Sequence, residues 1–193
     1  RPFIKMQGLR NHFVFLDCRA ASLPSKAEVI RICDVHAGVG AEQVITIQPP
    51  RSAGAHAYMG IHNTDGTEAQ ACGNATRCIA RWEMLRTGKP SLTITTDRGI
   101  LFAEDAGDGL TAVNMGQPQL RWDEIPLARE MDTLHLPIEG DPAATGMGNP
   151  HCTFFVEDAE AVDLAARGAE IEHHPLYPQR TNVQFASVIG PDR

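Results

Sequence analysis

The chain has 193 residues, of which 42% are hydrophobic, 21% charged and 6% aromatic. This composition is ordinary for a globular protein, and the length suits one large domain or two small ones. The net charge of −7 and the lack of a basic stripe argue against a nucleic-acid binder. No apolar run approaches the ~20 residues that span a bilayer, so no membrane association is predicted.

The five cysteines include no C-x-x-C pair. An odd count without such a pair argues against a disulfide framework and against a zinc knuckle. A reducing cytoplasm is therefore the expected location. The pair His173-His174 has no further ligand at a useful spacing, so no metal site is expected.

The first half of the chain is predicted to form a sheet with two helices. The expected strands lie in residues 3–17 (two strands about a turn at Gly8), 44–47, 56–63, 91–96, 99–104 and 110–115. The helices are expected over 24–35 and 74–87. The second helix is predicted to bury one face that carries Ala75, Cys78, Ile79, Trp82 and Leu85.

The second half repeats this theme. Residues 116–130 show no periodicity and are interpreted as a connection between domains, followed by a strand (151–156), a helix (158–167) and a strand (181–189). A weak internal repeat aligns Asn11 with Asn149 and the pair Gln43-Val44 with Asn182-Val183. The repeat predicts two related halves. A counterpart of Cys72 would fall near residue 210, so we expect the complete protein to be longer, and the missing initiator Met also suggests an earlier start.

The segment from Asn63 to Cys78 carries the strongest chemical signal. Cys72 stands directly before Gly73 and Asn74, which open the predicted helix. Unpaired N–H groups and a partial positive charge at a helix N-terminus can hold a carboxylate and lower the pKa of a thiol. We therefore expect a reactive thiol beside an anion site. The alternative is a buried cysteine next to an ordinary helix cap by Asn74.

A second signal lies in residues 147–152, where a Gly-Asn-Pro turn precedes His151 at a strand start. Such a histidine can take the proton of a thiol, although a solvated histidine in a turn is the plainer alternative. Cys152 and Cys78 are expected in the core. Amide side chains in turns or at strand ends can bind both charges of a zwitterionic amino acid, although each is also an ordinary turn former. These are Asn11, Gln43, Asn63, Asn74, Asn149 and Asn182.

Together these segments resemble the diaminopimelate epimerase family. The resemblance rests on residues 5–13, 38–43, 63–77, 113–116, 147–152 and 181–183, in the family's order. It implies an α+β fold of two pseudo-symmetric domains, each with mixed, mainly antiparallel strands around a central helix. Residues 1–116 would be the N-terminal domain with the first cysteine. Residues 117–193 would be an incomplete C-terminal domain that lacks the second cysteine.

The resemblance also implies an activity. The family interconverts LL- and meso-diaminopimelate, for lysine and cell-wall synthesis, by passing a proton between two thiols without pyridoxal phosphate or metal. Cys72 matches the first cysteine, and His151 matches the histidine that handles the proton of that thiol. The matching substrate contacts are Asn11, Gln43, Asn63, Gly73, Asn74, Asn149 and Asn182. No cofactor, an amino-acid substrate and a cytoplasmic homodimer are therefore expected.

Some positions depart from the family pattern. Arg10 replaces a glycine in the turn before Asn11, and Gln7 and His12 replace its usual neighbours. These changes leave open a racemase or epimerase for another polar amino acid. The family's second Cys-Gly segment and its Glu-Arg pair are absent, which leaves open a non-catalytic amino-acid-binding relative or a fragment without a ligand.

Overall fold

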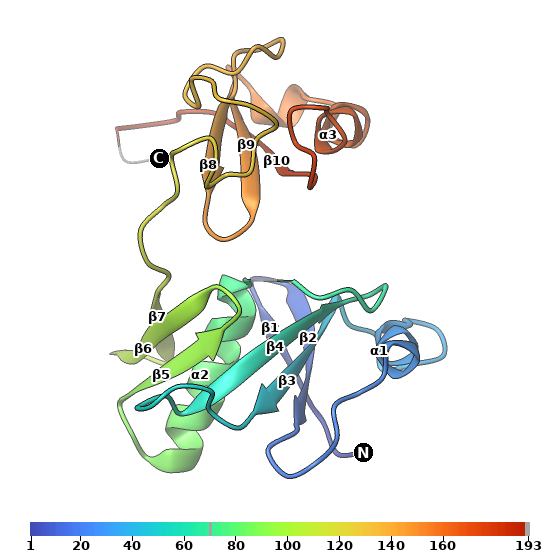
Figure 1. Ribbon diagram of the computed structural model, residues 1–193, viewed down its shortest axis with the longest axis vertical. Coiled ribbons are helices and arrows are strands. Elements are labelled where there is room, and N and C mark those ends of the chain that lie inside the picture. The colour runs from blue at the N-terminus through green and yellow to red at the C-terminus, as the bar shows by residue number, and fades with distance from the viewer. Residues whose placement is uncertain (70, 192–193) are drawn as a thin grey trace. The chain divides into compact units, whose positions relative to one another are not determined.

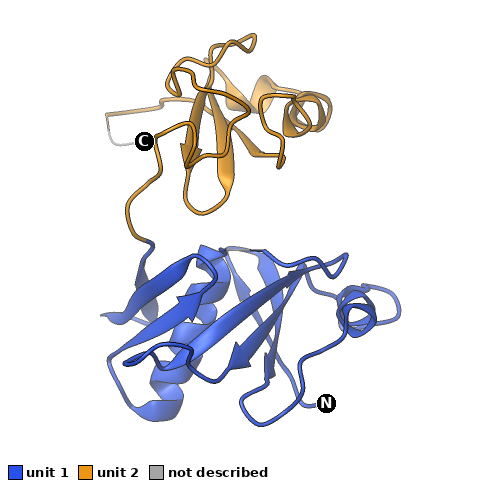
Figure 2. Ribbon diagram, in the orientation of Figure 1, with its two compact units in different colours: residues 1–115 blue, residues 116–193 orange. Residues whose placement is uncertain are grey.

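A computed structural model describes residues 1–69 and 71–191, so Gln70 in the Cys72 segment and the last two residues lie outside it. The chain divides into two compact units, Arg1–Met115 (unit 1) and Gly116–Arg193 (unit 2) (Figure 2). This division lies one residue from the boundary expected from the sequence. That the units are the two catalytic domains of one enzyme stays a prediction.

Unit 1 is built on a seven-stranded sheet whose strands follow chain order (Figure 1). They are β1 (Ile4–Gly8), β2 (Asn11–Asp17), β3 (Gln43–Gln48), β4 (Ala57–Asn63), β5 (Ser91–Thr96), β6 (Gly99–Gly107) and β7 (Leu110–Asn114). Neighbours pair antiparallel except β2 with β3 and β4 with β5. Parallel neighbours need a crossover, and α1 (Lys26–Cys33) and α2 (Gly73–Thr87) lie in these two connections.

The two helices of unit 1 cover opposite faces of the sheet. Along β2, Phe13 packs in one cluster with Ile79 of α2, and its neighbour Val14 packs in another with Val29 of α1. The strand is therefore buried on both faces, as parallel neighbours usually require. The strands β1, β2, β5, β6 and β7 all contact α2, which is the central helix of this unit (Figure 1).

Local signals place both helices close to their expected positions. Ser25 caps α1 by accepting the Glu28 N–H, and the Glu28 carboxylate accepts the Ser25 N–H in return. Gly88 ends α2 with φ at 69°, a left-handed conformation that glycine adopts without steric cost. The buried face of α2 was partly mispredicted, because Leu85 is 68% exposed. The buried face of α2 follows the four-residue spacing of Ala75, Ile79 and Glu83, together with the residue directly after each of them. Leu85 lies just outside this face.

Unit 2 repeats the beginning of unit 1. Its elements are β8 (Ala143–Gly146), β9 (Pro150–Phe155), the short 3₁₀ helix η1 (Ala159–Ala161), α3 (Leu164–Glu172) and β10 (Asn182–Ala186). An antiparallel pair, β8 and β9, is followed by a helical crossover to β10, which pairs parallel with β9. The same sequence of pairings joins β1, β2, α1 and β3. The pairing of His151 with Asn182 in unit 2 corresponds to the pairing of Phe13 with Gln43 in unit 1. The expected internal repeat is therefore confirmed.

Several expectations for unit 2 were wrong. The helix expected over 158–167 begins at Leu164, because Asp163 accepts the Ala166 N–H as its cap and residues before it form only a 3₁₀ turn. The strand expected over 181–189 ends at Ala186, and β8 was not predicted. Residues 116–130 are not a simple connection, since Ile125 and Leu127 are buried in the core of unit 2.

None of the helices in residues 1–69 and 71–191 is long and apolar enough to cross a membrane.

Among the polar groups buried in unit 1, His62 on β4 is only 9% exposed, and its Nε2 has no hydrogen-bond partner among the described residues. Burial lowers the pKa of His62 below its ordinary 6.5, although Glu68 opposes this shift. The unfolded chain then takes up the proton first as pH falls. His62 therefore reduces stability as pH falls below ~6.5 toward its folded pKa.

We expect the unfolding free energy to fall less steeply between about pH 7.5 and about pH 5.5 in His62→Gln than in the unchanged protein. Urea denaturation at each pH measures this slope. His135→Gln is the matched control. Asp141 raises the pKa of His135, so His135 affects the pH dependence of the unfolding free energy in the opposite direction. Equal slopes for His62→Gln and the unchanged protein would contradict the assignment.

Candidate active site

Three amide side chains of unit 1 meet at one edge of the sheet. Asn11 opens β2, Gln43 opens β3 and Asn63 closes β4. Because β2 and β3 are parallel and β4 runs the other way, these ends share an edge. Gln43 and Asn63 are paired in register, and Gln43 Nε2 donates to Asn63 Oδ1 at 3.1 Å. The strand order thus gathers residues that lie 52 positions apart in the chain.

The N-terminus of α2 reaches the same edge. Asn74 Nδ2 donates to Asn11 Oδ1 at 3.4 Å, and the Arg77 guanidinium donates to Asn74 Oδ1. Gly8 permits this approach, because a Cβ there would lie 3.2 Å from the carbonyl oxygen of Asn74. The amides and the start of α2 therefore form one half-site within unit 1.

Cys72 is the N-cap residue of α2, with an extended backbone at φ −153°. Its carbonyl oxygen accepts both the N–H and the hydroxyl of Thr76 at 2.9 Å. Within the described residues no side chain caps this helix, so the expected alternative of a cap by Asn74 is wrong. The first N–H groups of α2, beginning at Gly73, have no acceptor inside the helix and suit a carboxylate.

The thiol of Cys72 differs from its expected state. Burial raises the pKa of this thiol, while the N–H groups of Ala75 and Asn74 and the charge of Arg77 oppose the shift. The expectation of a lowered pKa is therefore wrong. Desolvation of a thiolate here outweighs the helix N-terminus. The neutral thiol predominates at pH 7, and a base is needed to remove its proton.

The turn between β1 and β2 carries backbone strain beside Asn11. Leu9 and Arg10 have φ values of 52° and 68°, a left-handed conformation that costs non-glycine residues about 1 kcal/mol each. Gln7 Oε1 accepts the Arg10 N–H at 3.0 Å and closes the turn. Two of the three departures from the family pattern thus contact each other in this turn.

A buried acceptor also lies at this edge. Gln43 Oε1 is shielded from solvent and has no hydrogen-bond partner among the described residues. Buried amide oxygens are normally paired, so this atom is suited to an N–H donor on a ligand.

Unit 2 contributes a second group of candidate residues. His151 and Asn182 pair in register on β9 and β10, and Asn182 Nδ2 donates to the carbonyl oxygen of Pro150 at 3.1 Å. His151 Nε2 lies 3.0 Å from Asn149 Oδ1. The ring is half-buried rather than solvated, and burial lowers the pKa of His151, although its contact with Gln184 opposes this shift. A neutral imidazole at pH 7 is able to act as a base.

Some residues that contact the candidates were missed. Gln184 Nε2 lies 2.8 Å from His151 Nδ1, and Tyr177 hydrogen-bonds the Cys152 thiol. The alternation of strand side chains places Gln184 on the same face as Asn182, and this signal was available in the sequence. Cys152 and Cys78 lie in the cores of their units, as expected, at 0% and 6% exposure.

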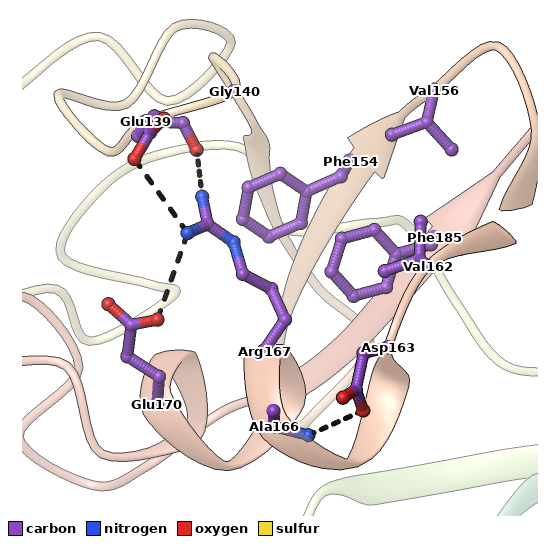
Figure 3. Close-up of a pocket in the computed structure, with 10 residues that line it drawn as sticks. All are labelled: Glu139, Gly140, Phe154, Val156, Val162, Asp163, Ala166, Arg167, Glu170 and Phe185. Atoms are coloured by element: carbon purple, nitrogen blue, oxygen red, sulfur yellow. Dashed lines mark hydrogen bonds and ion pairs between the residues drawn. The ribbon is translucent and has the colours of Figure 1, made fainter.

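A cavity in unit 2 is not part of this group. It has a volume of about 480 Å³ and lies between α3 and the strands β9 and β10 (Figure 3). The rings of Phe154 and Phe185 stack along it with centroids 4.8 Å apart. Arg167 there already pairs with Glu139 and Glu170. None of the candidate residues lines this cavity, and the charge of the Arg167 guanidinium in it is already neutralised.

Within residues 1–69 and 71–191, no group of three or more histidine, cysteine or acidic side chains is placed to hold a metal ion.

Comparison with known proteins identifies the family. The model of the diaminopimelate epimerase family matches residues 3–121. The diaminopimelate epimerase of Rhodospirillum centenum is 47% identical over 197 residues, which cover the whole chain and 68% of the relative. That of Acidiphilium cryptum is 48% identical and is covered over 71% of its length. This chain belongs to the diaminopimelate epimerase family. It is thus related to isomerases.

The family match contains all the candidate residues of unit 1, while those of unit 2 lie in the alignments to the two relatives. Solved structures share the fold of this chain. A probable proline racemase from Agrobacterium radiobacter is 15% identical, with a TM-score of 0.61 over 98% of this chain and 67% of that one. A hydroxyproline epimerase from Agrobacterium vitis is 14% identical, with a TM-score of 0.54 over 89% of this chain and 54% of that one. The expected α+β fold of mixed, mainly antiparallel strands is confirmed.

Proposed function

We propose that this protein interconverts LL- and meso-diaminopimelate by moving a proton at the α-carbon, in lysine and cell-wall precursor synthesis. One observation carries the proposal beyond family membership. The Cys72 thiol stands at the N-terminus of α2, where the N–H groups of Asn74 and Ala75 act on it, beside a group of amide side chains. This combination offers an acid–base group, a carboxylate site and uncharged contacts for an ammonium group.

The proposed roles are those that the family resemblance implies. Cys72, as thiolate, takes the α-proton, and its own proton passes to His151. The raised pKa of the Cys72 thiol and the lowered pKa of His151 make both groups neutral beforehand. The carbanion needs a preorganised, water-excluded site, because no cofactor is proposed to act as an electron sink. A second thiol, as the family resemblance implies, would return a proton to the opposite face of the α-carbon. The proposed substrate contacts are Asn11, Gln43, Asn63, Gly73, Asn74, Asn149 and Asn182.

The proposal includes a cytoplasmic homodimer that uses no cofactor. A second candidate is an epimerase or racemase of another polar amino acid. The strained turn at Leu9 and Arg10 favours it, because this turn lies directly before Asn11 and departs from the family pattern.

We expect the complete gene product to exchange the α-proton of LL-diaminopimelate for deuterium in D₂O without added cofactor. Proton NMR follows the loss of the α-signal, and L-lysine and L-proline serve as competing substrates. Exchange of one of these without exchange of diaminopimelate would support the second candidate. Binding of diaminopimelate without exchange of any α-proton would leave a non-catalytic binding protein as the better assignment.

A further inference from the structure

The ring of His151 lies between two amide side chains. Gln184 Nε2 is 2.8 Å from His151 Nδ1, and Asn149 Oδ1 is 3.0 Å from His151 Nε2. Gln184 is itself held, because its Oε1 accepts the Thr153 hydroxyl at 3.3 Å. Thr153, Gln184, His151 and Asn149 therefore form one continuous chain of hydrogen bonds across β9 and β10.

This chain determines which ring nitrogen carries the proton. In the structure Gln184 Oε1 accepts the Thr153 hydroxyl, and the NH₂ group of Gln184 faces His151. Nδ1 must then accept, and Nε2 carries the hydrogen that it donates to Asn149 Oδ1. A proton added at Nδ1 would place two donors face to face. Protonation at this nitrogen therefore requires the Gln184 amide to turn, so that its Oε1 accepts from Nδ1 and its NH₂ group donates to the Thr153 hydroxyl.

We propose that Gln184 is a positioning residue that holds His151 as the neutral Nε2–H tautomer. The effect of this tautomer on proton transfer rests on the proposed function. The tautomer itself does not.

No other group around His151 among the described residues carries a charge that would favour one tautomer over the other, so the Gln184 amide determines the tautomer. Thr145 of β8 and Asn182 of β10 pair with it in register, and the Tyr177 phenol donates to its carbonyl oxygen at 3.5 Å. The adjacent Cys152 thiol and the Tyr177 phenol both have raised pKa values, so both are neutral at pH 7. Within the described residues no ion pair involves His151.

The test replaces the donor by an acceptor of the same shape. In Gln184→Glu a carboxylate would face Nδ1, so we expect the Nδ1–H tautomer and a pKa of His151 raised by about 1 unit or more. Gln179→Glu is the matched control, since it adds the same charge on an exposed side chain. Circular dichroism confirms that each variant is folded.

Histidine ¹⁵N labelling of the complete protein reports both tautomer and pKa without substrate. The pH profile of kcat/KM for α-proton exchange should show its acidic limb moved upward by the same amount in Gln184→Glu. An Nδ1–H tautomer in the unchanged protein, or an unaltered pKa in Gln184→Glu, would overturn the inference. A shifted pKa in a protein that never exchanges α-protons would retain the inference and refute the proposed function.

Discussion

Cys72→Ala in the complete protein is expected to abolish α-proton exchange and to leave the fold intact. Loss of a group that takes part directly in proton transfer costs ~10³-fold or more in kcat. The thiol is only partly buried at the edge of the unit 1 core, so its removal should cost at most about 1 kcal/mol of stability. Deuterium exchange measures the first effect, and urea denaturation measures the second.

Cys33→Ala is the matched control for this experiment. Cys33 is a buried free cysteine on α1, in the cluster on the other face of the sheet from α2. It should lose stability of similar size but keep α-proton exchange. Retained exchange in Cys72→Ala would refute the role of Cys72. Equal loss of exchange in both variants would point to a general effect on folding.

The second large effect concerns a buried carboxylate in the central helix. Glu83 is 2% exposed, and its two oxygens lie 3.0 Å from the Arg19 guanidinium and 2.6 Å from that of Arg86. Replacing both arginines with alanine leaves this charge buried without a partner. We expect a loss of about 3–5 kcal/mol in the unfolding free energy, a large part of the stability of a small domain. Urea denaturation measures the loss.

Two further variants test the cause of this loss. Adding Glu83→Met to the double arginine variant removes the unpaired charge and should restore part of the lost stability. Arg81 of the same helix forms a more exposed ion pair with Asp105 of β6, and Arg81→Ala should cost less than about 1 kcal/mol. If Glu83→Met lowers stability further in the double variant, packing of the arginine side chains rather than charge is responsible.

The helices show where local sequence signals suffice and where they fail. The start and end of α2 were predicted to within one residue, because its period and the glycine after it act over a few positions. The start of α3 was missed by six residues, since the cap at Asp163 competes with the earlier Asp158, which holds only a 3₁₀ turn. Glu83 was not singled out at all, because nothing in the sequence places Arg19 beside it.

In the candidate site, too, local features could be predicted from the sequence and tertiary neighbours could not. The candidate side chains could be chosen from motifs, since turns, helix starts and amides are local features. The pKa of Cys72 could not be predicted, because the expected helix effect is opposed by burial under residues distant in sequence. The bond between Gln184 and His151 likewise depends on the parallel register of β9 and β10, which a crossover through α3 establishes.

The sequence by itself therefore determined the family, the order of most elements, the internal repeat and the residue types available for proton transfer. These properties depend on short-range patterns and on motifs with specific spacing. Only the tertiary structure decided that the Cys72 thiol is neutral, that Glu83 is a buried charge and that His151 has an amide on each side. Burial and strand register join residues that lie tens of positions apart, and electrostatic free energies depend on those neighbours rather than on adjacent residues in the chain.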